Sequence, residues 1–466
     1  MLPVVASAML TPLIVATALF MENMDATVIS TSLPVIAQDL HVDPISLKLA
    51  LTSYLVSLAV FIPVSGWMAD RFGARRIFRW AIAIFMAGSL FCAFSKSLEG
   101  FVLARFLQGM GGAMMVPVGR LVILRTTRKE ELVKALSYLT IPALLGPVFG
   151  PPLGGFISTY FHWRWIFLIN LPIGVLGIAL AGRFIADLKS DNVPPLDIPG
   201  FLFTGIGLSA LMLGLASEGK HMLSADLSIA ASVLGIILLL AYLWHYRRVA
   251  HPLLDLSLLR LKTFHASVIG GFFFRVGTGA TPFLLPLMLQ LGLGYSPFES
   301  GLLTCSTAIG AIFMKTIVAR VLERFGFRRV LIVNSVLAGV SMAVYALFQP
   351  GTPHLLMLLV FLAGGCLRSL QFTSLNAIAF ADVDQARMSH ATSLSSVAQQ
   401  LAAGFGVTVA AMSLQTTTWL QGRAQPQLSD YAWGFVVMGA LAAGSVLHFL
   451  PLDRTSGAAL ASTRKA

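Results

Sequence analysis

The chain has 466 residues, of which 57% are hydrophobic and only 11% are charged. A soluble domain carries roughly 25% charged residues and has too small an interior to bury so much apolar surface, so these proportions exclude a soluble protein and predict one surrounded by lipid. The net charge of +12 does not indicate nucleic-acid binding, because the basic residues lie in short loops between apolar runs, as in membrane proteins.

A helix needs about 20 apolar residues to cross a bilayer, and fourteen runs of this kind follow one another along the chain. None alternates with the period of two that a barrel strand requires. We therefore predict an all-α membrane protein with 14 spans. The spans are 8–33, 47–68, 77–95, 100–124, 135–159, 164–186, 199–217, 226–245, 265–290, 298–319, 328–348, 354–379, 389–414 and 431–450.

The distribution of Lys and Arg predicts how these spans are oriented. With the N-terminus inside, the cytoplasmic loops and the C-terminal tail hold 23 of the 32 basic residues, and the outer loops hold five. Such an excess predicts a multi-pass protein of the inner (cytoplasmic) membrane with both termini in the cytoplasm. The other four basic residues lie at membrane depth: Arg105, Arg275, Lys315 and Arg368.

One loop motif occurs twice, at a constant offset of 253 residues. Eight predicted helices separate the copies, which suits a transporter with two six-helix halves and two inserted helices. We predict the boundaries 1–190, 191–262 and 263–466. The acid of each copy is expected at the cytoplasmic end of the bundle, where its pairing can differ between conformations; alternatively the loop only directs orientation. The candidate gate residues are Asp70, Arg71, Gly73, Arg75, Arg76, Glu323 and Arg324.

Only two of the 20 acidic residues, Glu22 and Asp25, fall well inside a span. They are three residues apart and share one helical face. A charged group at membrane depth is costly, so it faces the bundle interior or a water-filled cavity. A carboxyl group balanced between burial and a nearby cation can bind and release a proton. We interpret both as proton-coupling candidates; an interfacial carboxylate, or one held permanently by an arginine, is the alternative.

Arg105 opens a glycine-rich stretch of the fourth span that continues to Ala113. An arginine at this depth needs a partner, which Asp25 or a backbone carbonyl could supply, so Arg105 joins the proton-coupling candidates. The alternative is a side chain that snorkels to the outer face. The glycines favour close helix packing.

The fifth span carries three prolines and four glycines within ten residues, 146–155. This composition predicts a kinked, closely packed helix whose bend can change with conformation, or else a static kink. Six of these seven residues are the candidates: Gly146, Pro147, Gly150, Pro151, Gly154 and Gly155. Polar and charged residues elsewhere in the spans could line a substrate cavity, or form interhelical hydrogen bonds: Gln108, Asn170, Arg275, Arg368, Gln371 and Asn376.

Five stretches together resemble the major facilitator superfamily and, within it, the fourteen-span drug:proton antiporter family (EmrB/QacA-like). They are 25–34, 66–76, 105–113, 146–155 and 163–174, the last reading WRWIFLINLPIG. The wider run, with VSGWMADRFGARRIF and PFLLPLMLQ, is similar to exporters of the MdtD type. Two departures are Glu22, which is additional to the motif core, and Ala319, which replaces a glycine of the second loop copy.

The resemblance implies proton-driven efflux of drugs or other amphipathic molecules by alternating access, with Asp25 and Arg105 in coupling. Cations in the second half favour an alternative cargo, organic anions or metal chelates. An enzyme is not expected, because the nine His are scattered and no soluble stretch exceeds about twenty residues. We expect no cofactor, no metal and no nucleic-acid partner, and a functional monomer in the lipid bilayer. The substrate, the proton stoichiometry, any periplasmic adaptor and the roles of Lys315 and Arg368 stay open.

Overall fold

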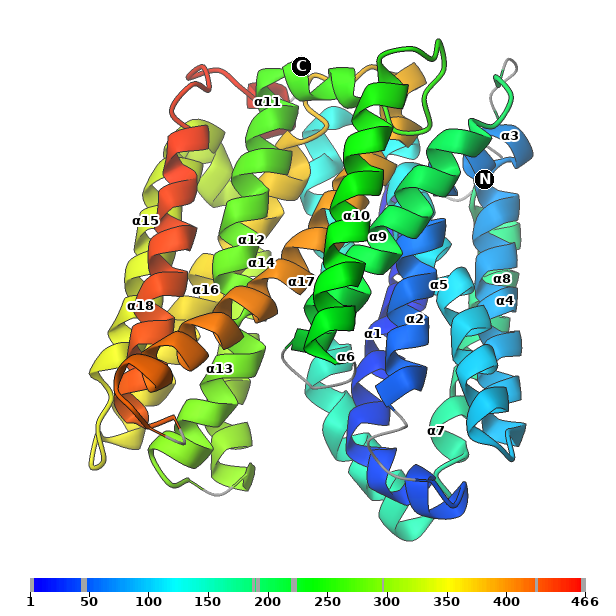
Figure 1. Ribbon diagram of the computed structural model, residues 1–466. Coiled ribbons are helices and arrows are strands. Elements are labelled where there is room, and N and C mark those ends of the chain that lie inside the picture. The colour runs from blue at the N-terminus through cyan, green and yellow to red at the C-terminus, as the bar shows by residue number, and fades with distance from the viewer. Residues whose placement is uncertain are drawn as a thin grey trace. The chain divides into compact units, whose positions relative to one another are not determined.

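The computed structural model describes residues 4–42, 48–186, 189, 193–218, 224–295, 297–423 and 426–461 (Figure 1). Every regular element among these residues is helical, and none of them forms a strand. The predicted all-α membrane class is therefore confirmed for the described part of the chain.

The chain divides into two compact units. The first comprises residues 1–128, 138–256 and 384–397, and the second comprises 129–137, 257–383 and 398–466. The two units are interleaved along the chain, because residues 384–397 belong to the first unit and residues 129–137 belong to the second. The boundaries predicted at residues 190 and 262 stay a prediction.

The helices of the first unit lie side by side in the blue-to-green part of Figure 1. They are α1 (Val4–Asp39), α2 (Lys48–Phe61), α3 (Ser65–Phe72), α4 (Ala74–Phe94), α5 (Leu98–Thr126), most of α6 (Leu132–Tyr160), α7 (Trp165–Leu168), α8 (Asn170–Phe184), α9 (Ile198–Glu218) and α10 (Ala225–Tyr246).

The second unit contains the green-to-red helices, together with the greater part of α17. Two π-helical turns, Ala266–Gly270 and Met288–Gly292, interrupt its first span. Its helices are α11 (Lys262–His265), α12 (Gly271–Gly279), α13 (Thr281–Leu287), α14 (Pro297–Phe325), α15 (Phe327–Val344), α16 (His354–Ile378), α17 (Met388–Leu420), α18 (Leu428–Gly444) and α19 (Ala458–Ala461).

Twelve helices of the described residues are long and apolar enough to cross a membrane. A bent pair, Ala50–Phe61 and Ser65–Phe72, meets at 57° and makes thirteen if it counts as one span. The predicted run 135–159 coincides with the 29-residue helix α6, several of whose side chains lie outside the described residues. Each predicted run thus coincides with helical residues. The total of fourteen membrane spans stays a prediction.

The offset of 253 residues also relates the helices themselves. Adding 253 to the bounds of α4, 74–94, gives 327–347, which are the bounds of α15 with the short helical turn that extends it. The glycine pair of α5, Gly111 and Gly112, likewise corresponds to Gly364 and Gly365 of α16. The repeat seen in two loops therefore extends through the membrane-spanning segments.

Those glycines allow neighbouring backbones to approach closely. A Cβ on Gly111 would lie 2.5 Å from the backbone nitrogen of Phe85, and one on Gly365 would lie 2.0 Å from the carbonyl oxygen of Thr307. Side chains larger than hydrogen cannot fit at such contacts without moving a helix. The glycine pair therefore fixes the spacing of α5 from α4, and of α16 from α14.

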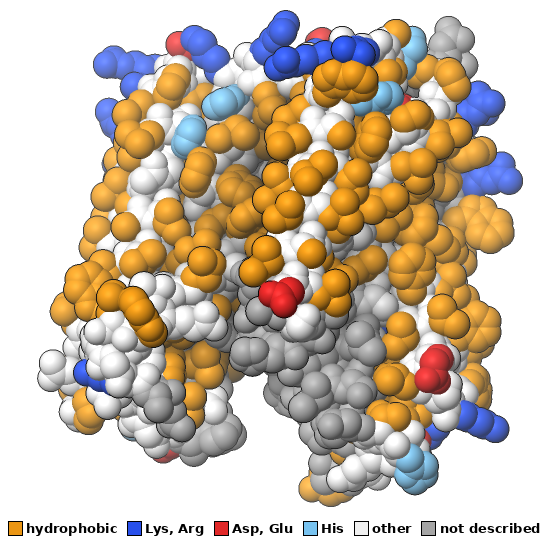
Figure 2. Space-filling view, in the orientation of Figure 1, with side chains coloured by type: hydrophobic (Ala, Val, Ile, Leu, Met, Phe, Trp, Pro, Cys, Tyr) orange, Lys and Arg blue, Asp and Glu red, His pale blue; other side chains and the backbone are white. Residues whose placement is uncertain are grey.

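Helices α9 and α10 pack against each other and expose an apolar flank, which Figure 2 shows as a continuous field of hydrophobic side chains. Leu202, Ile206, Ile237 and Leu240 are each about half exposed there. Such a surface on a soluble protein would aggregate, whereas a hydrocarbon environment solvates it. Lys and Arg gather at one edge of this face, as expected for a membrane boundary.

Candidate functional site

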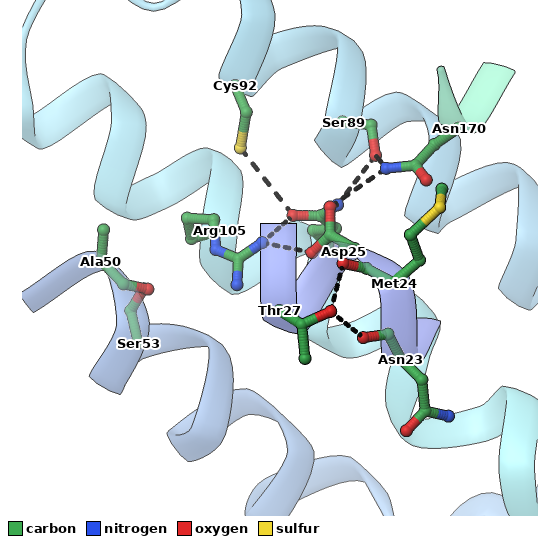
Figure 3. Close-up of polar contacts among 11 residues, drawn as sticks. Asn23, Met24, Asp25, Thr27, Ala50, Ser53, Ser89, Cys92, Arg105 and Asn170 are labelled. Atoms are coloured by element: carbon green, nitrogen blue, oxygen red, sulfur yellow. Dashed lines mark hydrogen bonds and ion pairs between the residues drawn. The ribbon is translucent and has the colours of Figure 1, made fainter. Parts of the chain in front are cut away.

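Asp25, near the middle of α1, is the centre of a buried polar network in the first unit (Figure 3). Arg105 of α5 donates from Nη1 to Asp25 Oδ2 over 2.7 Å. Gln108 donates to Asp25 Oδ1 over 2.8 Å, and Asn170 of α8 donates to the same oxygen over 3.0 Å. Two helices, α5 and α8, thus supply partners for both carboxylate oxygens.

Most polar atoms of this network also bond to one another, whereas Arg105 Nε and Asn170 Oδ1 have no hydrogen-bond partner among the described residues. Gln108 Oε1 accepts from Arg105 Nη1 over 2.5 Å, while the Gln108 amide and the Asn170 amide both donate to Ser89 of α4. The Arg105 guanidinium lies over the Tyr54 ring, 4.5 Å from its centre. The two charges are stable at this depth only because the carboxylate, the guanidinium and their hydrogen-bond partners lie together.

Glu22 lies one helical turn before Asp25 and differs from it in one respect. Its Oε2 atom is buried and makes no hydrogen bond of normal geometry, and the buried Tyr54 hydroxyl, which interacts with the Glu22 carboxyl group, makes none either. The carboxyl group of Glu22 is close enough to Asp25 and Tyr54 to interact electrostatically with both. A buried carboxyl oxygen without a donor is stable in the protonated state and costly in the charged one.

The glycines of the fifth span bring α6 against the part of α1 that carries the acids. Gly146, Gly150 and Gly154 are buried, and Thr27 donates to the carbonyl of Gly146 over 3.2 Å. A Cβ on Gly146 would lie 2.8 Å from the backbone nitrogen of Met24, next to Asp25. A change in the bend of α6 would therefore move residues flanking the acidic pair. The side chains of Pro147, Pro151 and Gly155 lie outside the described residues.

The first loop motif connects three helices around Asp70, the buried acid of α3. Arg125, at the end of α5, donates to Asp70 Oδ1 over 2.8 Å. Ser389, at the start of α17, donates to Asp70 Oδ2. Gly73 has φ +94° between α3 and α4, a conformation that L side chains rarely adopt, so the glycine permits the sharp turn. Among the other motif residues Arg71 and Arg76 are exposed and Arg75 is half-buried.

The start of α17 also packs onto α3 through a second serine. Ser393 accepts from the backbone nitrogen of Gly66 over 3.0 Å and shares a hydrogen bond with Ser65. Arg387 pairs with Asp255, in the segment that follows α10, over 2.6 Å. The loop motif and the inserted helices are thereby both linked to the first turns of α17.

The second copy of the loop differs from the first. Glu323 and Arg324 are both exposed at the end of α14, whereas Asp70 in the first copy is buried. Gly326 keeps the positive φ, at +72°. The turn is therefore common to both copies, and burial of the acid belongs to the first copy alone.

The candidate cavity residues of the second unit have different surroundings. Arg275 donates to Asn376 over 2.9 Å, and Gln371 accepts from Asn334 over 2.9 Å. Lys315 donates to Thr373 of α16. Arg368 instead lines a pocket with residues of α12 to α16, described below. Gln108 and Asn170, also interpreted as cavity residues, belong to the Asp25 network.

Sequence reasoning missed several partners of these groups. Ser89 and Tyr54 lie in apolar runs without a local motif, and nothing in the sequence marks them as neighbours of Asp25. Ser389 and Ser393 belong to a stretch rich in Ser and Thr, 389–396, which was an available signal for a helix end that makes polar contacts.

Comparison with known proteins identifies the family. The model of the Major Facilitator Superfamily matches residues 15–260 and 267–466. The chain belongs to this superfamily. It is 40% identical over 402 residues to MdtD of Klebsiella pneumoniae (strain 342), a protein named for multidrug resistance, with 86% of this chain and 85% of the relative covered. MdtD of Escherichia coli O7:K1 (strain IAI39 / ExPEC) is 40% identical over 404 residues, at the same coverage of both chains.

Solved structures of this superfamily share the fold. The proton:xylose symporter XylE, bound to 6-bromo-6-deoxy-D-glucose, has a TM-score of 0.67 at 17% identity and covers 97% of both chains. The human organic anion transporter MFSD10 has a TM-score of 0.65 at 14% identity and covers 96% of this chain and 100% of its own. This superfamily member is therefore a multi-pass membrane transporter of small molecules and not an enzyme, similar to MdtD.

Proposed function

We propose that this transporter exports drugs or other amphipathic small molecules from the cytoplasm in exchange for protons. It works by alternating access in the inner membrane, with both termini cytoplasmic and no cofactor. The 40% identity to proteins named for multidrug resistance supports the direction and the cargo. The observation that carries the proton coupling is the pair of buried acids in α1, of which Asp25 is fully hydrogen-bonded and Glu22 is not.

The difference between the two acids supports distinct roles. Arg105, Gln108 and Asn170 all donate hydrogen bonds to the carboxylate of Asp25, whereas Glu22 Oε2 has no donor and lies beside that charge. In the proposed cycle Glu22 carries the proton, and Asp25 with Arg105 adjusts its affinity as α1 moves. Proton entry from outside then returns the empty transporter, and release inside prepares it for substrate.

The proton gradient suffices as the energy source. One proton crossing 100 mV releases about 2.3 kcal/mol. Since about 1.4 kcal/mol corresponds to a tenfold ratio, each net charge moved sustains a concentration gradient of roughly fiftyfold. The sequence has no P-loop pattern that would indicate ATP as an alternative source.

Conformational coupling is assigned to α6 and to the loop motif. The glycines of α6 contact α1 beside Asp25, so bending of α6 can change the surroundings of the acids. The contacts of Asp70 with Arg125 and Ser389 stabilise one conformation and are expected to break in the other. We propose a functional monomer, and a periplasmic adaptor is not required by this scheme.

The test is dye transport by the full chain in proteoliposomes, with a pH gradient imposed and ethidium as the probe. Wild type is compared with Glu22→Gln and Asp25→Asn, and with Glu99→Gln as a control, because Glu99 is an exposed acid at the start of α5. We expect both α1 variants to lose gradient-driven transport by at least tenfold and the control to retain it.

Two outcomes would contradict the proposal. Export that persists after the pH difference and the voltage are both collapsed would exclude proton coupling. Unchanged proton dependence in both α1 variants would remove the acids from the coupling mechanism. Ethidium exchange at equilibrium, without a gradient, distinguishes a coupling defect from a general loss of activity.

A second candidate cargo, organic anions or metal-chelate complexes, is favoured by one observation. Arg368 lines a pocket of the second unit and has no hydrogen-bond or ion-pair partner among the described residues. Vesicle assays with ethidium and with an organic acid such as benzoate would separate the two cargoes.

A further inference from the structure

The offset of 253 residues relates two positions around Asp25 to positions in the second unit that carry different side chains. Asp25 in α1 corresponds to Thr278 in α12, and Tyr54 in α2 corresponds to Thr307 in α14. The glycine pair of α5 corresponds to that of α16, as described above. The second unit thus has a counterpart of the Asp25 region, but a hydroxyl group stands where the first unit has its central carboxylate.

This counterpart region contains a pocket within the second unit. The pocket itself is small, about 10 Å³, which is room for about one water-sized group; with its open mouth included, the space free of atoms is about 270 Å³. Residues of α12, α13, α14, α15 and α16 line it, together with Tyr345 in the turn that extends α15. The polar side chains among them are Thr278, Thr281, Thr307, Ser341, Tyr345 and Arg368.

Two hydrogen-bond donors of the pocket are unused. Arg368 has neither a hydrogen bond nor an ion pair among the described residues, and the same is true of the Tyr345 hydroxyl, although the Tyr345 side chain is only 3% exposed. The hydroxyl lies against the backbone of Gly364, where a Cβ would come within 2.3 Å of it. The glycine therefore leaves room for the phenol at the pocket wall.

The hydroxyl groups of the remaining polar side chains donate hydrogen bonds to nearby backbone carbonyl groups. Thr278 donates to the carbonyl of Phe274, and Ser341 donates to the carbonyl of Ala338, each within its own helix. A helical Ser or Thr hydroxyl can turn away from such a carbonyl at little cost, because that oxygen already accepts the backbone hydrogen bond. These side chains can therefore add weaker donors to a bound ligand.

The charge of the pocket decides which ligand fits. No carboxylate is among its lining residues, and Tyr345 is the titratable group that interacts with Arg368. In the first unit Arg105 is paired with Asp25, whereas no carboxylate of the described residues pairs with Arg368. A guanidinium at membrane depth is costly unless an anion or several acceptors accompany it, and a planar carboxylate is the group it binds best.

We propose that Arg368 and Tyr345 form an oxyanion subsite that binds a carboxylate group of the transported molecule. The guanidinium donates to the carboxylate oxygens, the Tyr345 hydroxyl donates to one of them, and the neighbouring hydroxyl groups complete the contacts. The proposal rests on the function proposed above and specifies one class of its substrates, amphipathic molecules that carry a carboxylate.

The experiment measures binding by the purified full chain in detergent, using the rise in Tm with benzoate as the probe. Benzamide is the neutral comparison of the same shape, and inorganic phosphate and chloride test whether any small anion suffices. We expect benzoate alone to stabilise wild type, Arg368→Gln to weaken its apparent affinity at least tenfold, and Arg368→Lys to retain part of it. Arg454→Gln is the control, because Arg454 is an exposed arginine outside the pocket.

A second pair of variants uses the correspondence with Asp25. Thr278→Asp introduces a carboxylate into the pocket. This carboxylate should form an ion pair with Arg368 and thereby abolish the benzoate effect. Thr278→Asn has nearly the same shape without the charge and should retain most of the effect. This comparison remains informative if Arg368→Gln folds poorly, since neither variant removes the arginine.

Three results would overturn the proposal: equal stabilisation by benzoate and benzamide, an unchanged benzoate effect in Arg368→Gln, or equal stabilisation by phosphate or chloride. The binding assay contains no gradient, so it is independent of proton coupling. Loss of gradient-driven ethidium transport in wild type would refute the proposed function while leaving the subsite intact, and loss of the benzoate effect alone would refute only the subsite.

Discussion

Arg105 and Asp25 form an ion pair of 2.7 Å between α5 and α1, with side chains 1% and 2% exposed. The two residues are 80 positions apart in the chain, and Gln108 bridges them by bonding both. Because neither charge is in contact with solvent, the pair acts as one unit: removing either member leaves the other buried without compensation.

A double-variant cycle tests this unit. Arg105→Gln and Asp25→Asn should each destabilise the protein by about 3–5 kcal/mol, the cost of breaking a buried pair. The combined variant should recover much of that loss, since no lone charge remains, yet it should not recover gradient-driven transport. Thermal unfolding and ethidium export measure the two quantities. Losses that simply add in the combined variant would contradict the coupling.

The close helix contacts give a second prediction. In Gly365→Ala the new Cβ meets the carbonyl of Thr307, so α14 and α16 must separate, at a cost of about 1–3 kcal/mol. Gly301→Ala in α14 meets nothing within 4 Å and should be neutral or slightly stabilising. The measurement is the Tm of each purified variant compared with that of wild type. Equal Tm values for the two variants would show that the contact does not fix the helix spacing.

The contacts of Asp70 give a third prediction. Asp70→Asn weakens the bonds from Arg125 and Ser389, so the conformation with α17 held against α3 becomes less populated. We expect ethidium transport to fall by at least tenfold while expression and Tm change little. Ser389→Ala should produce a smaller effect in the same direction. Arg79→Gln, at an exposed position of α4, serves as the control. Full activity of Asp70→Asn would exclude a gating role.

A pH dependence is expected at the end of α1, outside the membrane-spanning segment. Partial burial opposes ionisation of Asp39, but a hydrogen bond from Trp163 and the charge of Arg164, 2.8 Å away, outweigh it and lower the pKa of the carboxyl group below 3.8. A lowered pKa contributes stability that is present above the unfolded value and is lost as the pH falls through the folded value.

The measurement is Tm between pH 6 and pH 3 for wild type and Asp39→Asn. Wild type should lose stability more steeply below about pH 4. Because the Asp39 side chain is 34% exposed, solvent screens the pair and the difference should not exceed about 1 kcal/mol. Parallel curves would show that this ion pair contributes nothing measurable.

The positions of the spans and the candidate acids follow from sequence alone. Lipid requires long apolar runs, so an acid such as Asp25 inside one of them is conspicuous, and Arg105 is the nearest cation of comparable depth. The repeat at 253 residues was also visible, since Asp70 and Glu323 occupy matching loops. Tertiary structure was needed to show that one of these acids is buried and the other exposed.

The sequence by itself determined the all-α membrane class and where the long apolar runs lie, because the cost of unsatisfied backbone and exposed charge in hydrocarbon depends on local composition. Only the tertiary structure decided the partners: Asn170 joins Asp25 from 145 residues away and Ser389 joins Asp70 from 319 residues away, while Arg368 has no hydrogen-bond or ion-pair partner in the described part of the chain. Side-chain pairing depends on which helix faces pack together, and composition within a single run carries no record of that packing.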